Sequence, residues 1–155
     1  MAGLLEIVFE DVRQDVVLPL LQTVVANADT IVSAECSEDF FVWKDGRIEF
    51  DEVSAAIEFD ESLSIFINVR SLKVVSVIVD AALVRIVKYQ GRFDMDISFD
   101  EGDVGLQGVD VVGGVFAFST EMANEFEFVS CYFGMEPASD EATRFFTNSV
   151  LGPLK

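Results

Sequence analysis

Hydrophobic and polar residues alternate along much of this chain, with a period of two that is typical of β-strands buried on one face. The clearest case is the segment 63–69, in which every second residue from Leu63 onward is leucine, isoleucine or valine. Gly113-Gly114 predicts a turn or bulge. Further strands are expected at residues 4–9, 30–36, 55–59, 74–79, 115–118 and 126–132.

A first β-hairpin is predicted by Asp45-Gly46, a type I′ turn signal that joins the segments 40–44 and 47–51. In this register, one side of the hairpin is apolar and is expected to face the core. The pairs expected on that side are Trp43 with Ile48 and Phe41 with Phe50.

A second hairpin is predicted around Gln90-Gly91, with Tyr89 opposite Arg92. On its outer side Arg85 then faces Asp96, a favourable cross-strand charge pair. The register is well defined, because a shift of one residue would turn the apolar residues of the second strand to water. The pairs expected on the buried side are Lys88 with Phe93, Ile86 with Met95, and Val84 with Ile97.

An amphipathic helix is expected near the N-terminus, because apolar residues recur in pairs every four residues between Val16 and Val25. Pro19 fits this helix if it begins near Leu18, since proline suits the first turn.

A second helix is expected near the C-terminus, with Ser139 as its N-cap and with Asp140 and Glu141 in a first turn that favours anions. Gly152-Pro153 is expected to end this helix. Its apolar stripe consists of Ala142, Phe145, Phe146 and Val150. Together these elements predict a single α+β domain over residues 1–155. It has a large, mainly antiparallel sheet and one helix near each end of the chain.

The composition adds a strong negative charge. Of the 155 residues, 28 are acidic, 10 are basic and none is histidine, for a formal net charge of -18. The 15 phenylalanines and the hydrophobic content of 51% indicate a packed core rather than disorder. Nucleic acids and anionic membranes would be repelled and are not expected partners, whereas a basic protein would be attracted. Alternatively, the acidity only keeps a Phe-rich protein in solution.

The residue types argue against catalysis, cofactors and metal sites. Without histidine there is no Ser-His or Cys-His nucleophile and no imidazole ligand, and no phosphate-binding glycine motif is present. Asp94, Asp96, Ser98 and Asp100 have the opening spacing of a calcium loop, but the glycine and glutamate that complete such a loop are absent. We therefore expect this segment to be a strand whose acidic residues face outward.

The sequence favours a cytoplasmic location. The N-terminal segment lacks the positive charge of a signal peptide. The most apolar stretch, residues 74–87, is broken by Asp80 and Arg85 and falls short of the roughly 20 residues of a membrane-spanning helix. Cys36 and Cys131 form no CxxC motif and are expected to be buried thiols.

The acidic residues are distributed unevenly. Segment 35–61 carries ten acidic and two basic side chains, and segments 94–110 and 121–141 each carry six acidic and no basic ones. Segment 62–92 is instead basic, so its strands are expected to pair with acidic neighbours inside the sheet. Unpaired carboxylates then fall on connections at the rim, where they either form a docking surface or remain merely solvated. The residues expected to bind a partner are Asp60, Glu61, Asp100, Glu101, Asp103 and Asp110.

In size, charge and α+β class, the chain resembles the immunity proteins of contact-dependent growth inhibition systems. The resemblance covers the character of the whole chain and rests on no motif, so it transfers no individual residue. It implies a cytoplasmic, non-enzymatic inhibitor, monomeric rather than dimeric, that binds a basic toxin domain such as a nuclease. Carboxylates would pair with lysines and arginines of the toxin.

Two other function classes remain open. A secretion chaperone is also small, acidic and α+β, but it is dimeric, and Phe145 and Phe146 would then lie at the dimer interface. A small-molecule-binding or enzymatic domain would use a pocket under the sheet, with carboxylates as acid and base. Light scattering distinguishes a dimeric chaperone from a monomeric inhibitor, and a bound small molecule would indicate a ligand-binding or enzymatic domain.

Because like charges repel, we expect added salt to stabilise the protein by screening. The melting temperature should rise between low salt and ~0.3 M NaCl, as measured by differential scanning calorimetry. A melting temperature that stays constant over this range would contradict a concentrated acidic surface.

Overall fold

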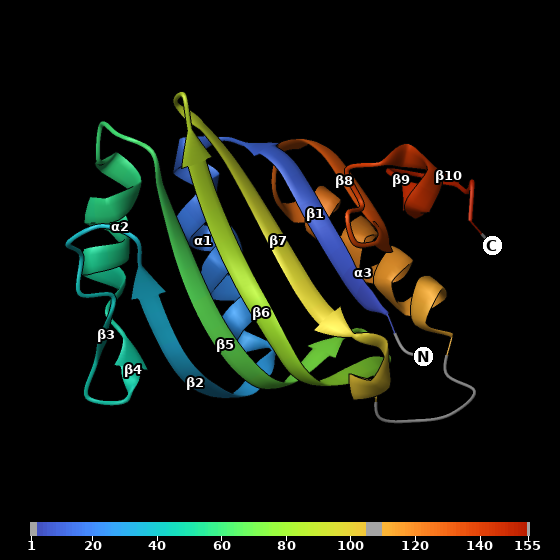
Figure 1. Ribbon diagram of the computed structural model, residues 1–155, viewed down its shortest axis with the longest axis horizontal. Coiled ribbons are helices and arrows are strands. Elements are labelled where there is room, and N and C mark those ends of the chain that lie inside the picture. Colours follow the sequence, from blue (N-terminus) through green and yellow to red (C-terminus); the bar gives the residue numbers. More distant parts are fainter. Residues whose placement is uncertain (1–2, 105–109, 155) are drawn as a thin grey trace.

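The chain folds around one large antiparallel sheet. The structure is a computed structural model that describes residues 3–104 and 110–154 (Figure 1). In these residues, eight strands pair in the order β10-β9-β8-β1-β7-β6-β5-β2, and β3 and β4 form a separate hairpin. The strands are β1 (Leu4–Val12), β2 (Ala28–Cys36), β3 (Trp43–Lys44), β4 (Arg47–Ile48), β5 (Leu63–Val74), β6 (Val77–Tyr89), β7 (Arg92–Asp100), β8 (Phe128–Met135), β9 (Arg144–Thr147) and β10 (Val150–Leu151).

Helices cover one face of this sheet. They are α1 (Gln14–Ala26), α2 (Phe50–Glu58) and α3 (Val111–Glu125), and η1 (Glu101–Asp103) and η2 (Glu141–Thr143) are single 3-10 turns. In Figure 1, α1 and α3 lie behind the sheet and α2 lies beside its β2–β5 edge. Ile7, Ile97 and Val84 form one cross-strand row that is fully buried against the helices. The predicted α+β class with a large antiparallel sheet is thus confirmed. No helix in the described residues is long and apolar enough to cross a membrane.

The β6–β7 hairpin has the predicted register. Tyr89 pairs with Arg92 and Arg85 pairs with Asp96. Gln90 and Gly91 both have positive φ angles, of 51° and 75°, as a type I′ turn requires.

The first predicted hairpin is correct only next to its turn. Trp43 pairs with Ile48, but Phe50 begins α2 instead of continuing the strand, and Phe41 is 78% exposed. The predicted strand 55–59 is therefore wrong as well. Buried residues in this segment follow a helical spacing, and they are Val53, Ala56 and Ile57.

The predicted strand 115–118 and the predicted turn at Gly113-Gly114 are also wrong, because both lie in α3. The Asp110 carboxylate caps this helix by accepting a hydrogen bond from the Gly113 nitrogen at 2.8 Å. Gly114 packs so closely on the sheet that a Cβ atom there would collide with Val77. Gly114 therefore allows close helix–sheet packing, and Gly113 leaves room for the capping carboxylate of Asp110.

The predicted strand 74–79 is correct at its ends but is interrupted by a tight turn. Val74 ends β5, Val75-Ser76 form the turn, and Val77 begins β6. Val74 and Val77 pair across this turn and are buried, and Val75 adopts a φ of 59°. The turn contains none of the glycine, asparagine or aspartate residues that usually reveal one, which is why a run of β-branched residues concealed it.

The predicted helix that begins at Ser139 is wrong. Asp140 caps only the single turn η2, and the chain then continues as β9 and β10. Phe146 pairs with Phe133 of β8 and is fully buried. The free edge of β8 offers backbone hydrogen-bond partners to this segment, and this long-range pairing overrides the local helical pattern.

The N-terminal helix exists but begins at Gln14 rather than near Leu18, so Pro19 lies inside it. A proline there removes one backbone hydrogen bond. The carbonyl of Pro19 accepts a hydrogen bond from the Thr23 hydroxyl at 3.0 Å. The predicted apolar stripe is confirmed, and its buried members are Val17, Leu20, Leu21, Val24 and Val25.

Both cysteines are free thiols. Cys131 is buried as predicted, and burial raises the pKa of its thiol to about 12. Cys36 is only half-buried, and burial raises the pKa of its thiol as well. Both thiols are therefore less easily ionised than a free cysteine.

Lys88 fastens α2 to the sheet. Its side chain lies on the helix-covered face and is buried, with its ammonium 5.3 Å from the centre of the Phe93 ring. The Nζ atom donates hydrogen bonds to the carbonyls of Ile57, at 3.1 Å, and Phe59. These carbonyls lie at the C-terminal end of α2, where the helix dipole favours a cation.

Replacing Lys88 should therefore destabilise the fold. We expect Lys88→Met to lower the free energy of unfolding by about 1.5–3 kcal/mol, because it removes hydrogen bonds made by a charged group and leaves two carbonyls without this partner. Urea denaturation measures the change. Lys73→Met, at an exposed position of β5, is the control and should shift stability by less than about 0.5 kcal/mol. Equal effects of the two substitutions would show that Lys88 is not an anchor.

Candidate functional site

The face of the sheet turned away from the helices is the candidate site, and we call it the open face. Successive strand residues point to opposite sides, so the residues between buried ones point here. One row consists of Glu6, Ser98, Leu83 and Asn68, and the next of Val8, Asp96, Arg85 and Phe66. In the part of the chain that the structure describes, no helix covers this face (Figure 1).

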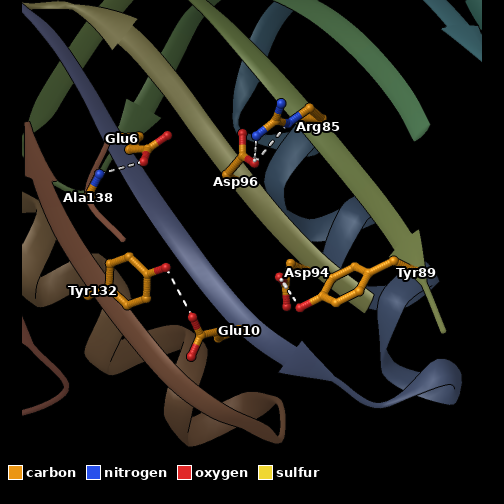
Figure 2. Close-up of polar contacts among 8 residues, drawn as sticks. All are labelled: Glu6, Glu10, Arg85, Tyr89, Asp94, Asp96, Tyr132 and Ala138. Carbon is orange, nitrogen blue, oxygen red and sulfur yellow. Dashed lines mark hydrogen bonds and ion pairs between the residues drawn. The ribbon is translucent and has the colours of Figure 1, made fainter. Parts of the chain in front are cut away.

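Carboxylates gather on β1 and β7 within the open face, as Figure 2 shows. Glu10 accepts hydrogen bonds from the hydroxyls of Tyr132, at 3.1 Å, and Ser130, at 3.3 Å. Both donors come from the neighbouring strand β8 and are uncharged. The Glu10 carboxylate is therefore fixed in position without being neutralised.

Glu6 and Asp94 are held in the same way. Glu6 accepts a hydrogen bond from the Ala138 backbone nitrogen at 2.7 Å. Asp94 accepts one from the Asp11 backbone nitrogen at 2.8 Å and one from the Tyr89 hydroxyl at 3.3 Å. Backbone and tyrosine donors thus orient these carboxylates and leave their negative charge in place.

Asp96 has a cationic partner. Its Oδ2 atom accepts from Nε and Nη2 of Arg85 at 2.9 and 2.8 Å, across the β6–β7 pair predicted from the sequence. Asp94, Asp96 and Ser98 all lie on the outer side of a strand, as predicted, but Asp96 is only 6% exposed. A carboxylate so buried costs free energy unless it is paired.

Burial makes ionisation of three side chains on this face less favourable, namely Glu6, Asp96 and Tyr132. It raises the pKa of Glu6, an effect that the Ala138 hydrogen bond opposes and that repulsion from Asp96 and Glu136 reinforces. Burial also raises the pKa of Asp96, despite the nearby Arg85 guanidinium. Burial and the neighbouring Glu10 carboxylate together raise the pKa of Tyr132. Additional positive charge on this face would relieve these costs.

Three of the predicted site residues lie together at one end of the sheet. Asp100 ends β7, and with Asp103 it lines a hollow of about 460 Å³ that also contains Arg70. Glu101 lies between them in η1, where its carboxylate accepts a hydrogen bond from the Gly3 nitrogen at 3.3 Å. The hollow opens on the open face between β1 and β2.

The other predicted residues lie elsewhere. Asp60 and Glu61 are exposed and precede β5, whose first residue, Leu63, pairs with Lys88 beside the β6–β7 turn. Asp100 lies at the opposite end of β7. Asp110 is exposed and caps α3. The structure therefore does not bring the six predicted residues into one surface.

Sequence reasoning missed Glu6 and Glu10 as members of the candidate site. Glu6 alternates with apolar residues in the predicted strand 4–9, and Glu10 directly follows this strand in the same alternation, which was a usable signal for their side of the sheet. It did not reveal that β1 lies between β7 and β8, which brings Glu6 beside Ser98 and Glu10 beside Ser130. In the described residues, no three histidine, cysteine or acidic side chains converge as metal ligands would.

The raised pKa of Glu6 makes a prediction about stability. The folded protein binds the Glu6 proton more tightly than the unfolded chain does, so ionisation above that pKa costs stability. Glu6→Gln removes this cost, and its amide oxygen still accepts from Ala138. We expect the variant to be more stable than the parent at pH 7, with the difference shrinking as the pH falls toward 4.5, the ordinary value.

Urea denaturation across this pH range measures the difference. Glu121→Gln, which removes one negative charge from the exposed surface of α3, is the matched control. If both variants behave alike at every pH, the burial of Glu6 has no energetic role.

Comparison with known proteins agrees with this architecture. No curated protein matches the sequence. The whole chain superimposes on the whole of a chain in the 1.75 Å crystal structure of the toxic C-terminal tip of CdiA from Pseudomonas aeruginosa in complex with immune protein, with a TM-score of 0.86 and 28% sequence identity. The model of the PABL017 Cdi1I immunity protein family matches residues 3–151, which confirms the resemblance predicted from the sequence. The chain belongs to the PABL017 Cdi1I immunity protein family.

Proposed function

We propose that this protein is the immunity protein of a contact-dependent growth inhibition system and that it binds and neutralises the toxic C-terminal tip of a CdiA protein. The observation that carries the proposal is the full-length match, at 28% identity, to a chain from a complex of such a tip with its immune protein. Family membership over residues 3–151 supports it independently.

We further propose that it acts without catalysis, as a cytoplasmic monomer, by covering a basic surface of the toxin. The net charge of -18 supports a basic partner, since a field of one sign speeds the encounter with an oppositely charged protein. A nuclease fits this requirement, because its substrate groove must attract phosphates.

The chaperone alternative loses the interface on which it relied. Phe145 and Phe146 lie on strand β9 rather than on a helix. Phe146 is fully buried, and its ring lies 5.2 Å from that of Phe116 and 5.9 Å from that of Phe133. Phe146 therefore belongs to the core, and Phe145 is half-buried against it.

Co-expression tests the proposed function. The cognate CdiA C-terminal tip, sought beside the gene for this protein, is induced in a bacterial host with and without this chain. We expect the tip alone to stop growth and the chain to restore it, while a CdiA tip from an unrelated system remains toxic. Continued growth arrest in the presence of soluble, folded chain would contradict the proposal.

A further inference from the structure

The open face exposes apolar side chains as well as carboxylates. Leu4, Val32 and Tyr89 are 43%, 48% and 37% exposed, although leucine and valine are among the residues most often buried in proteins. Phe66, Leu83 and Val87 are half-buried between them. Apolar residues interspersed with tyrosine and rimmed by polar groups are typical of surfaces that bind another protein.

The open face is also hollowed. The hollow of about 460 Å³ reaches across β1, β7, β6, β5 and β2, with Leu4, Leu83 and Asn68 in its lining. It is broad enough for side chains of a partner to enter, and Arg70, Asp100 and Asp103 supply polar contacts within it.

The charge of the open face determines the sign of its partner. Two of its arginines are already engaged by carboxylates, since Arg85 pairs with Asp96 and Arg92 lies 3.5 Å from Asp11, whereas Arg70 lines the hollow. The carboxylates of Glu6, Glu10 and Asp94 are held by uncharged donors instead. The complementary surface is therefore cationic, and it bears arginine or lysine side chains.

These carboxylates are also preorganised. Tyr132 and Ser130 fix Glu10, and the Asp11 backbone and Tyr89 fix Asp94. A partner that binds them therefore does not lose affinity to the ordering of flexible side chains.

From the coincidence of a sheet face that no described helix covers, exposed apolar residues, a hollow and fixed anionic groups, we infer that the open face is the surface on which the toxin tip docks. Arginine or lysine side chains of the toxin contact Glu10 and Asp94, and apolar toxin residues cover Leu83 and Tyr89. This inference rests on the proposed function and adds to it the location and the chemistry of the contact.

Paired amide variants test the location. Glu10→Gln with Asp94→Asn removes two negative charges from the open face and keeps one accepting oxygen in each side chain. The amide nitrogen that replaces the other oxygen can donate to the neighbouring hydroxyl, because a hydroxyl oxygen also accepts. Asp60→Asn with Glu61→Gln removes the same charge from the connection before β5. Binding of each purified variant to the CdiA tip encoded beside the gene is measured by surface plasmon resonance.

We expect the open-face pair to weaken binding by about tenfold or more, since truncating one partner of an interfacial charge pair raises the dissociation rate. The Asp60 and Glu61 pair should change affinity less than about threefold, because only the long-range field is altered. An equal loss in both would show that overall charge matters rather than the open face, and would overturn the inference.

A steric variant tests the same face without changing its charge. Asn68 is exposed in the lining of the hollow, so Asn68→Trp blocks close approach while leaving the core intact. We expect it to abolish binding with an unchanged melting temperature. Full binding by both Asn68→Trp and the open-face pair, with toxin neutralised by the parent chain, would place docking elsewhere and leave the proposed function intact. Failure of the parent chain itself to bind would overturn both.

Discussion

Burial of one face of the eight-stranded sheet is the constraint on which the rest of this molecule depends. All three helices lie on or beside that face, and their apolar residues meet alternate residues of the strands. Because a strand residue that does not point to the core must point to the other side, this arrangement decides what the open face contains. Glu6, Asp94 and Arg85 are displayed together because Ile7, Met95 and Ile86 are needed beneath α1 and α3.

The same constraint explains the electrostatics of the open face. A half-covered sheet removes part of the water around Glu6 and Asp96, which raises the pKa of each. The chain supplies Arg85 to Asp96 but only backbone and hydroxyl donors to the neighbouring carboxylates. Burial of these carboxylates therefore costs free energy, and contact with a cationic surface would recover some of it. In the docking inferred above, stability and recognition are opposed at these positions, as is common at binding sites.

Local sequence signals predicted some elements and misled about others. The β6–β7 hairpin was predictable to the residue, because a turn dipeptide and an unbroken alternation point to the same register. By contrast, Val75-Ser76 contains none of the residues that usually indicate a turn. The apolar pattern of Phe145 and Phe146 is compatible with a helix, but this segment pairs with the edge of β8 and is a strand. The sequence predicts an acidic docking surface on the connections, and this stays a prediction, whereas the carboxylate cluster of the open face lies on strands. The carboxylates on β1 become neighbours of those on β7 only through a pairing of segments some 90 residues apart.

The exposure of Phe41, Leu4, Val32 and Tyr89 on a molecule with so large a charge has a colloidal consequence. Exposed apolar residues of this kind normally promote aggregation. Two copies with the same large negative charge repel each other, however, and this repulsion keeps their apolar residues from coming into contact. The acidity can therefore prevent aggregation of the protein while no partner is bound. The negative charge opposes self-association of a chain whose apolar side chains are exposed, whereas it attracts a cationic protein.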